Sequence, residues 1–140
     1  MFEDRLVIRM NATQCRVWDL APDGGEGLDD LAGATEITDG HALLSLVGTQ
    51  LEPLMERLCR LDIFAPEVSP PRLFQGSLLD LSCQMVRFGG VGGEEAILIA
   101  LPRGYGQSAA DAILKTGCDL GLDPAGEIRF KEWLQKLHSA

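Results

Sequence analysis

Residues 40–61 read GHALLSLVGTQLEPLMERLCRL, and they carry the clearest structural signal in the chain. The mostly apolar run 42–47 lies between two glycines, which predicts a buried strand. Thr49 and Glu52 have the spacing of a capping box, in which the hydroxyl accepts an orphan backbone N–H and the carboxylate reaches back. The leucines that follow recur at helical spacing, with charged residues between them. The stretch therefore predicts a strand followed at once by an amphipathic helix over 49–61.

Further strands are predicted downstream of this helix. The connection 62–72 contains three prolines and is expected to be extended. Residues 78–88 are a strand candidate with a polar interruption, and the glycines of 89–93 are expected to form a flexible hairpin tip. The run 96–101 is a second buried strand, which Pro102 ends.

Two helices are predicted after the last strand. The first carries Tyr105 and Ile113 on one face, and Gly117 is expected to end it as the C′ residue. The terminal helix has an apolar face with i, i+3, i+4, i+7 spacing, made by Phe130, Trp133, Leu134 and Leu137.

The N-terminal part of the chain predicts a hairpin and a loop. Residues 6–10 and 15–20 are predicted strands, and 11–14 join them. Residues 22–30 are rich in glycine and acidic side chains, so they are expected to form a solvated loop.

From residue 42 onward the predicted order is strand, helix, strand, hairpin, strand, helix. This order is most of a split β-α-β, ferredoxin-like layer, a sheet with helices on one face. The sequence therefore predicts an α+β fold in which the N-terminal hairpin extends or covers the sheet. The 140 residues suit a single domain, with the hairpin and loop at 1–35, the core at 36–122 and the C-terminal helix at 123–140.

Charge and composition exclude some classes of function. The chain has 12 basic and 21 acidic side chains and a net charge of -9. Nucleic acids and anionic membrane surfaces attract basic proteins, so neither is an expected partner. The N-terminus lacks the basic and apolar segments of a signal peptide, and no apolar run approaches the ~20 residues of a membrane span. The chain is expected to be soluble and cytoplasmic.

The four cysteines, Cys15, Cys59, Cys83 and Cys118, are far apart in the sequence. A zinc site needs clustered thiolate or imidazole ligands, and the sequence has no such cluster. No metal is expected, and the cysteines are interpreted as small apolar side chains in a reducing compartment.

Asp80 is the first candidate ligand contact, because no catalytic constellation is evident. It lies between Leu79 and Leu81 in an apolar stretch, and on a strand it would share a face with Leu78 and Ser82. A buried carboxylate needs hydrogen-bond donors, which the N–H groups of a bound pterin ring would supply. The alternative is a solvent-facing carboxylate at a sheet edge.

Arg103 and Tyr105 are the second candidate contact. They follow the last predicted strand at a strand-to-helix turn, where a cation and a phenol are able to line a pocket mouth. The alternative is a surface arginine and a tyrosine packed in the core.

Five segments share a pattern with a known family. They are ITDGHALLSLVG at 37–48, the end of the predicted helix at 61–63, QGSLLD at 75–80, LIALPRGY at 98–105 and AILKTGCDLGL at 112–122. Together they resemble the folate-binding superfamily of the glycine-cleavage T-protein, an aminomethyltransferase, over about 36–122. In length and rhythm the chain is most similar to the gamma subunit of heterotetrameric sarcosine oxidase, a short member of that superfamily.

The resemblance implies a fold that, in full-length relatives, binds tetrahydrofolate and accepts a one-carbon unit. Asp80 matches an acidic position that lies near the folate in those relatives, whereas Ser77 and Leu81 depart from the family pattern. The resemblance also implies a folate site made by Asp80, Arg103 and Tyr105, in which Arg103 pairs with the glutamate tail.

Three functions follow as hypotheses. The first is a small non-catalytic subunit or accessory protein that docks on a larger partner in one-carbon or amine metabolism, because one short domain leaves a folate pocket half open. The second is a tetrahydrofolate-binding component of the aminomethyltransferase type. The third is a homodimeric interaction domain of ferredoxin-like fold, an architecture that hosts unrelated functions.

Overall fold

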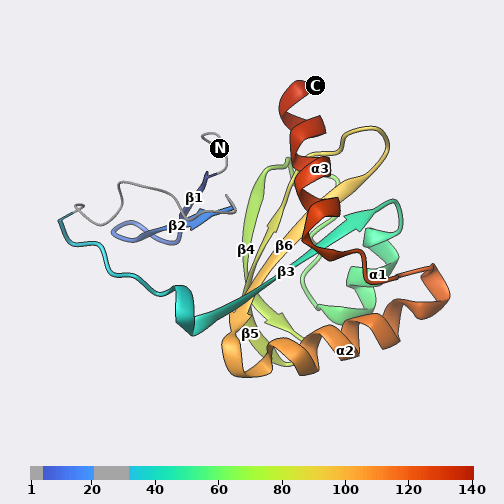
Figure 1. Cartoon of the computed structure of the whole chain (residues 1–140), viewed down its shortest axis with the longest axis horizontal. Helices are drawn as coiled ribbons and strands as arrows, with labels where there is room; N and C mark the ends of the chain where they lie inside the picture. The colour runs from blue at the N-terminus through green and yellow to red at the C-terminus, as the bar shows by residue number, and fades with distance from the viewer. Residues whose placement is uncertain (1–4, 21–31) are drawn as a thin grey trace. The chain divides into compact units, whose positions relative to one another are not determined.

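The computed structural model describes residues 5–20 and 32–140 (Figure 1). The chain divides into two compact units, Met1–Ile37 and Thr38–Ala140. The described residues form two antiparallel sheets and three α-helices. The predicted α+β class is therefore confirmed.

The N-terminal unit contains a β-hairpin, as predicted. β1 (Arg5–Arg9) pairs antiparallel with β2 (Cys15–Asp19). Asn11 organises the connection, because its Oδ1 accepts hydrogen bonds from two backbone N–H groups of the loop, at 2.9 and 3.0 Å. The acidic loop predicted for 22–30 lies outside the described residues.

The second unit is built on a four-stranded antiparallel sheet with the order β3-β6-β5-β4. The strands are β3 (His41–Gly48), β4 (Arg72–Leu78), β5 (Leu81–Arg87) and β6 (Glu95–Pro102). The strands predicted at 42–47 and 96–101 are confirmed with slightly wider bounds. The glycine-rich tip predicted at 89–93 lies between β5 and β6, and Gly92 and Gly93 have the positive φ angles of a tight turn.

The single strand predicted at 78–88 is wrong. A two-residue turn, Leu79 and Asp80, separates β4 from β5. The sequence does not reveal this turn because it contains neither the glycine nor the asparagine that marks a two-residue hairpin.

Three α-helices and three short 3-10 turns complete the second unit. The helices are α1 (Leu51–Leu58), α2 (Gly106–Gly117) and α3 (Gly126–Ser139). The turns are η1 (Thr38–Gly40), η2 (Arg103–Tyr105) and η3 (Cys118–Leu120). Each predicted helix is present, with changes at its ends.

The ferredoxin-like arrangement is not confirmed. That arrangement follows a β-α-β-β-α-β order, which requires a helix between the third and fourth strands. Here β4, β5 and β6 follow one another as a meander, and β6 then pairs with β3. Every neighbouring pair in the sheet is antiparallel, so β3 and β4, which α1 connects, run in opposite directions and form no split β-α-β unit.

α1 is shorter than the helix predicted over 49–61, and the predicted capping box is wrong. The N-cap residue is Gln50, which makes no side-chain capping hydrogen bond. The helix ends at Leu58 because Cys59 has an extended backbone, with φ -140° and ψ 144°. Cys59 then forms a β-bridge with Leu78, so the end of β4 stops the helix.

Gly117 is the last residue of α2 rather than a left-handed C′ residue. Its φ is -98°, and the left-handed residue that follows the helix is Gly121, with φ 78°. A Cβ added to Gly117 would lie 2.9 Å from the Cβ of Leu122 and 3.1 Å from the Cδ1 of Leu54. Gly117 is therefore needed for close packing and not for its conformational freedom.

One face of the four-stranded sheet packs against α1 and α2. Met85 of β5 pairs with Ile99 of β6 on this face, and both side chains are completely buried. The helices contribute Leu51, Leu54, Met55, Leu58, Ala109 and Ile113 to the same core.

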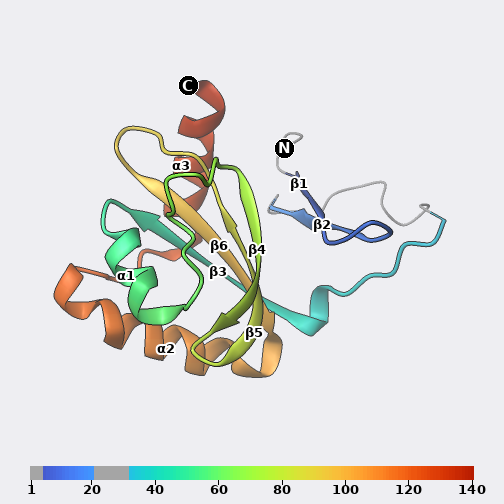
Figure 2. The ribbon, with the colours of Figure 1, turned by 180° about the vertical axis from the view of Figure 1, so that it is seen from behind.

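α3 covers the opposite face of the sheet, so the prediction of helices on one face only is wrong (Figure 1, Figure 2). Val86 pairs with Leu98 on that face, and Phe88 continues the row just beyond β5. The Phe88 ring lies 6.2 Å from the ring of Phe130 and 5.8 Å from that of Trp133, both on α3. Helical spacing predicts the apolar face of α3 but does not indicate which side of the sheet receives it.

Gly117→Ala is expected to lower the free energy of unfolding by about 1–2 kcal/mol, because overpacking costs roughly 1–3 kcal/mol and the helix propensity of alanine offsets up to about 1 kcal/mol of it. Urea unfolding followed by circular dichroism measures the change. Gly104→Ala is the matched control, because nothing lies within 4 Å of a Cβ added there. Equal stability of the two variants would mean that the packing around Gly117 yields without cost.

Candidate functional site

Asp80 lies at the tip of the β4–β5 hairpin. Leu78 pairs with Leu81, and Leu79 and Asp80 form the turn between them, with φ angles of 51° and 62°. Two successive left-handed residues are typical of a type I′ turn. The predicted face shared with Leu78 and Ser82 is therefore wrong, and the Asp80 side chain is exposed.

Leu79 shows how this turn is held in place. A leucine in the left-handed region is unfavourable, because its Cβ approaches the following carbonyl oxygen. Here the Leu79 N–H donates to the carbonyl of Leu58 at 2.9 Å, and its side chain packs against the core. The end of α1 thus fixes the position of the turn, and with it that of Asp80.

Arg103 and Tyr105 lie in η2, directly after β6. The side chain of Arg103 is 69% exposed, and its Nη1 lies 3.8 Å from the carboxylate Oδ1 of Asp39. Asp39 is itself fully exposed, so this contact in water contributes little stability. Tyr105 is 52% exposed and is not packed in the core.

The structure brings the three predicted residues to one end of the sheet. Gln84 of β5 pairs with Ala100 of β6, so the start of β5 and the end of β6 lie at the same end (Figure 1, Figure 2). Within the described ranges, no hydrogen bond or ion pair links Asp80 to Arg103 or Tyr105. We call these three residues the β6-end rim.

Other site types have little support in the described part of the chain. A shallow depression runs along α3 and is lined by Glu132, Gln135, Lys136, Ser139 and Ala140; no residue of the β6-end rim lines it. Across residues 5–20 and 32–140, no three His, Cys, Asp or Glu side chains lie together as a possible metal site. None of the described helices has the length and apolar character needed to cross a membrane.

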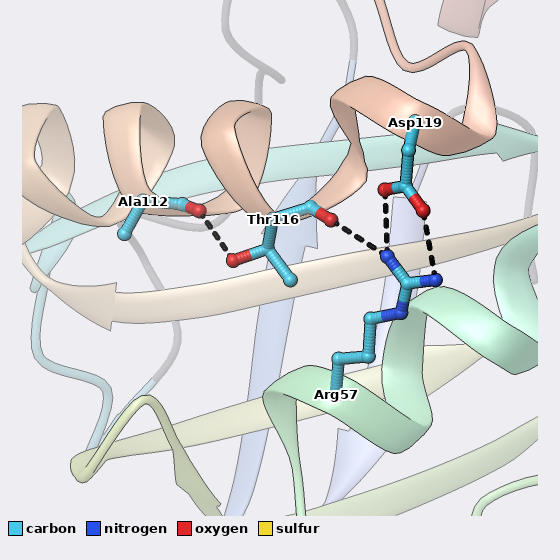
Figure 3. A network of polar contacts seen from close by, with 4 residues as sticks. All are labelled: Arg57, Ala112, Thr116 and Asp119. Carbon is cyan, nitrogen blue, oxygen red and sulfur yellow. Dashed lines mark hydrogen bonds and ion pairs between the residues drawn. The ribbon is translucent and has the colours of Figure 1, made fainter.

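Arg57 joins α1 to the end of α2 (Figure 3). Its Nη1 and Nη2 donate to the two carboxylate oxygens of Asp119 at 2.7 and 3.0 Å, and Nη1 also donates to the carbonyl of Thr116 at 3.0 Å. The hydrogen bond from Arg57 lowers the pKa of Asp119. The resulting stabilisation is present above the ordinary carboxyl pKa and is lost as the pH falls through the lower value. Arg57 therefore has a structural role, since it links α1 to Thr116 and Asp119.

Arg87, the last residue of β5, forms a second set of linking hydrogen bonds. Its Nε and Nη2 donate to the Glu95 carboxylate at 2.8 and 2.9 Å, and its Nη1 donates to the carbonyl of Ile63 at 3.1 Å. The guanidinium also lies 4.3 Å from the centre of the Phe64 ring. The hydrogen bond to Glu95 raises the pKa of Arg87. All three guanidinium nitrogens donate within the protein, so this arginine is not offered to a ligand.

Leu43 is a surface residue that the sequence pattern does not predict. It belongs to the run 42–47, for which burial was predicted, yet it is 45% exposed. β3 lies at the edge of the sheet, and Leu43 is on the face opposite the core into which Ala42, Leu44 and Leu46 pack. A uniformly apolar run does not distinguish an edge strand from a central one, so only the strand order reveals this surface.

The cysteines differ in their surroundings. Cys59 and Cys83 are buried, whereas Cys15 and Cys118 are exposed. Burial, together with the neighbouring Cys59, raises the pKa of the Cys83 thiol from its ordinary 9.0 to about 11. Because the thiolate is the reactive form, Cys83 is a poor nucleophile at neutral pH.

The chain is similar to part of sarcosine oxidase subunit alpha from Rhizobium meliloti (strain 1021). The two are 34% identical over 98 residues, which is 64% of this chain and 9% of that protein. No family model matches the chain, and no solved structure matches it. The similarity supports a loose relation to sarcosine oxidase through its alpha subunit, whereas the gamma subunit and the T-protein superfamily remain predictions.

Alkylation of the native chain at about pH 8 is expected to label Cys15 and Cys118 and to spare the two buried thiols. Peptide mass spectrometry identifies the labelled cysteines, and labelling after denaturation is the control. Rapid labelling of Cys83 in the native chain would contradict the burial described above.

The same burial predicts a loss of stability in alkaline solution. Between pH 9.0 and about 11 the unfolded Cys83 thiol ionises while the folded one keeps its proton, so the free energy of unfolding falls as the pH rises. Chemical denaturation across this range measures the effect, and Cys83→Ala is expected to remove this component of it.

Proposed function

We propose that the chain is a small non-catalytic subunit or accessory protein of a sarcosine oxidase-type assembly, similar in role to the gamma subunit. The observation that carries this proposal is the similarity to a stretch that makes up 9% of sarcosine oxidase subunit alpha. A short chain that resembles one part of a large subunit is suited to packing against a larger protein of one-carbon or amine metabolism. Its expected compartment is the cytoplasm.

The composition of the β6-end rim supports docking there. Tyrosine and arginine are enriched among the residues that dominate interface energies. Tyr105 and Arg103 are 52% and 69% exposed, and Asp39 holds Arg103 only loosely. A carboxylate of a partner protein is therefore able to replace Asp39 and to bind Arg103 through two hydrogen bonds.

The tagged chain is expected to form a stable complex with the purified larger subunits of the sarcosine oxidase-type enzyme from the same genome. Size-exclusion chromatography detects the complex, and calorimetry measures its affinity. Tyr105→Ser and Arg103→Ser are each expected to weaken binding at least about tenfold, since interface hot spots of this kind contribute more than 1.4 kcal/mol. Arg60→Ser replaces an exposed arginine on another segment and is expected to bind normally. Separate elution of both proteins at about 50 µM, well above the dissociation constants of most stable complexes, would refute the proposal.

Tetrahydrofolate binding is a second candidate function. It is supported by the exposure of Asp80, Arg103 and Tyr105 at one end of the sheet. The carboxylate would accept the N–H groups of the pterin, the guanidinium would pair with the glutamate tail, and the phenol would pack against a ring.

Excess 5-formyltetrahydrofolate is expected to raise the thermal midpoint by several degrees, because a ligand at about 100-fold its dissociation constant adds about 2.7 kcal/mol. Asp80→Asn is expected to abolish the shift without unfolding the chain, since asparagine tolerates the left-handed backbone. Asp62→Asn replaces an exposed aspartate of another segment and is expected to keep the shift. No shift with the unaltered chain would exclude folate binding, and a shift that survives Asp80→Asn would exclude this site.

A further inference from the structure

Among the strands that the structure describes, β3 has a partner on one side only. It is the first strand in the order β3-β6-β5-β4, and it pairs with β6 alone. Within the described part of the chain, residues 42–48 make no backbone hydrogen bond outside that ladder. Among the described strands, none but β6 pairs with this segment, and backbone groups on the unpaired side of an edge strand are able to pair with another strand.

β3 also lacks the features that normally prevent edge strands from pairing. Such edges usually carry charged side chains, proline or a β-bulge. Residues 42–48 contain no charged residue and no proline. The register with β6 runs without interruption over eight pairs, so the strand has no bulge.

The opposite edge of the sheet, β4, is protected. The bridge between Cys59 and Leu78 covers its end. Two prolines precede the strand, and its first residue is charged. The β4 edge thus carries features that hinder strand pairing, whereas residues 42–48 of β3 lack charge and proline and pair with β6 alone among the described strands.

We propose that β3 pairs antiparallel with β3 of a second copy of this chain, around a two-fold axis at Ser45. The pairing joins two four-stranded sheets into one eight-stranded sheet. Ser45 lies opposite its own copy, Leu43 opposite Val47, and Leu44 opposite Leu46.

The pattern of β3 favours a second copy in this register. Around a two-fold axis perpendicular to the sheet, each residue must meet a residue of the same face, so only every second register is possible. The register centred on Ser45 matches apolar with apolar on both faces and covers Leu43, which is 45% exposed. The next register, centred on Leu44, would place Leu43 opposite Ser45. No like charges oppose each other within the strand in either case.

Sedimentation equilibrium of the full chain tests the proposal without any other protein. A single strand pair makes a small interface, so a dissociation constant on the order of micromolar is expected. Ser45→Lys places two ammonium groups opposite each other and is expected to weaken the dimer at least about tenfold. Ser77→Lys is the matched control, since Ser77 is an exposed serine on the guarded edge β4, and it is expected to dimerise like the unaltered chain. A monomer at about 200 µM, well above that constant, or an unweakened dimer of Ser45→Lys, would overturn the proposal.

Site-specific cross-linking checks the register and does not depend on the folding of the lysine variant. In a Cys15→Ser, Cys118→Ser background, Ser45→Cys is expected to form a covalent dimer with a short bismaleimide, because opposed residues have Cβ atoms about 5 Å apart. Leu43→Cys and Ser77→Cys are expected to remain monomeric. If β3 instead receives a strand of another protein, Ser45→Cys gives no covalent dimer and the proposal fails.

Discussion

The burial of β6 on both faces is the constraint on which the rest of the second unit depends. Every residue from Ala96 to Leu101 is at most 3% exposed. A strand with two buried faces needs a layer on each side, and it cannot alternate apolar with polar residues. α1 and α2 supply one layer, and α3 lies on the other face, where Phe130 and Trp133 pack on Phe88.

The central position of β6 also determines which strands form the edges of the sheet. With β3 on one side and β5 on the other, the meander leaves β3 and β4 as the two edges. The chain between α1 and β4 starts at the β4 edge, where Cys59 forms a bridge with Leu78, and Arg87 of β5 then binds the carbonyl of Ile63 and packs over Phe64. In the described part of the chain, no strand other than β6 pairs with residues 42–48 of β3. The two edges therefore differ because the connection after α1 protects only one of them.

The sequence predicts the elements that depend on local patterns and fails for those that depend on contacts between distant residues. The apolar runs 42–47 and 96–101 and the spacing in the three helices predict elements that the structure confirms. The sequence does not predict the turn at Leu79 and Asp80, because a leucine takes a left-handed conformation here only through packing and a hydrogen bond to Leu58. The predicted position of Asp80 is wrong for the same reason. The sequence predicts it on a strand face, whereas it lies exposed at a hairpin tip. Arg103 and Tyr105 follow a strand end that the pattern does predict, so their placement at a strand-to-helix turn was correct.

The predicted burial of β3 and the observed exposure of its side chains differ, and this difference has a physical meaning. A mostly apolar composition predicts burial because exposed apolar surface is costly in water, and six of the eight residues of β3 are apolar or glycine. In the isolated chain Leu43 remains 45% exposed and Ser45 is exposed as well. Long apolar edges of this kind are prone to aggregate unless another strand covers them. An edge whose composition is that of a central strand is therefore explained most simply if β3 becomes a central strand when the chain assembles.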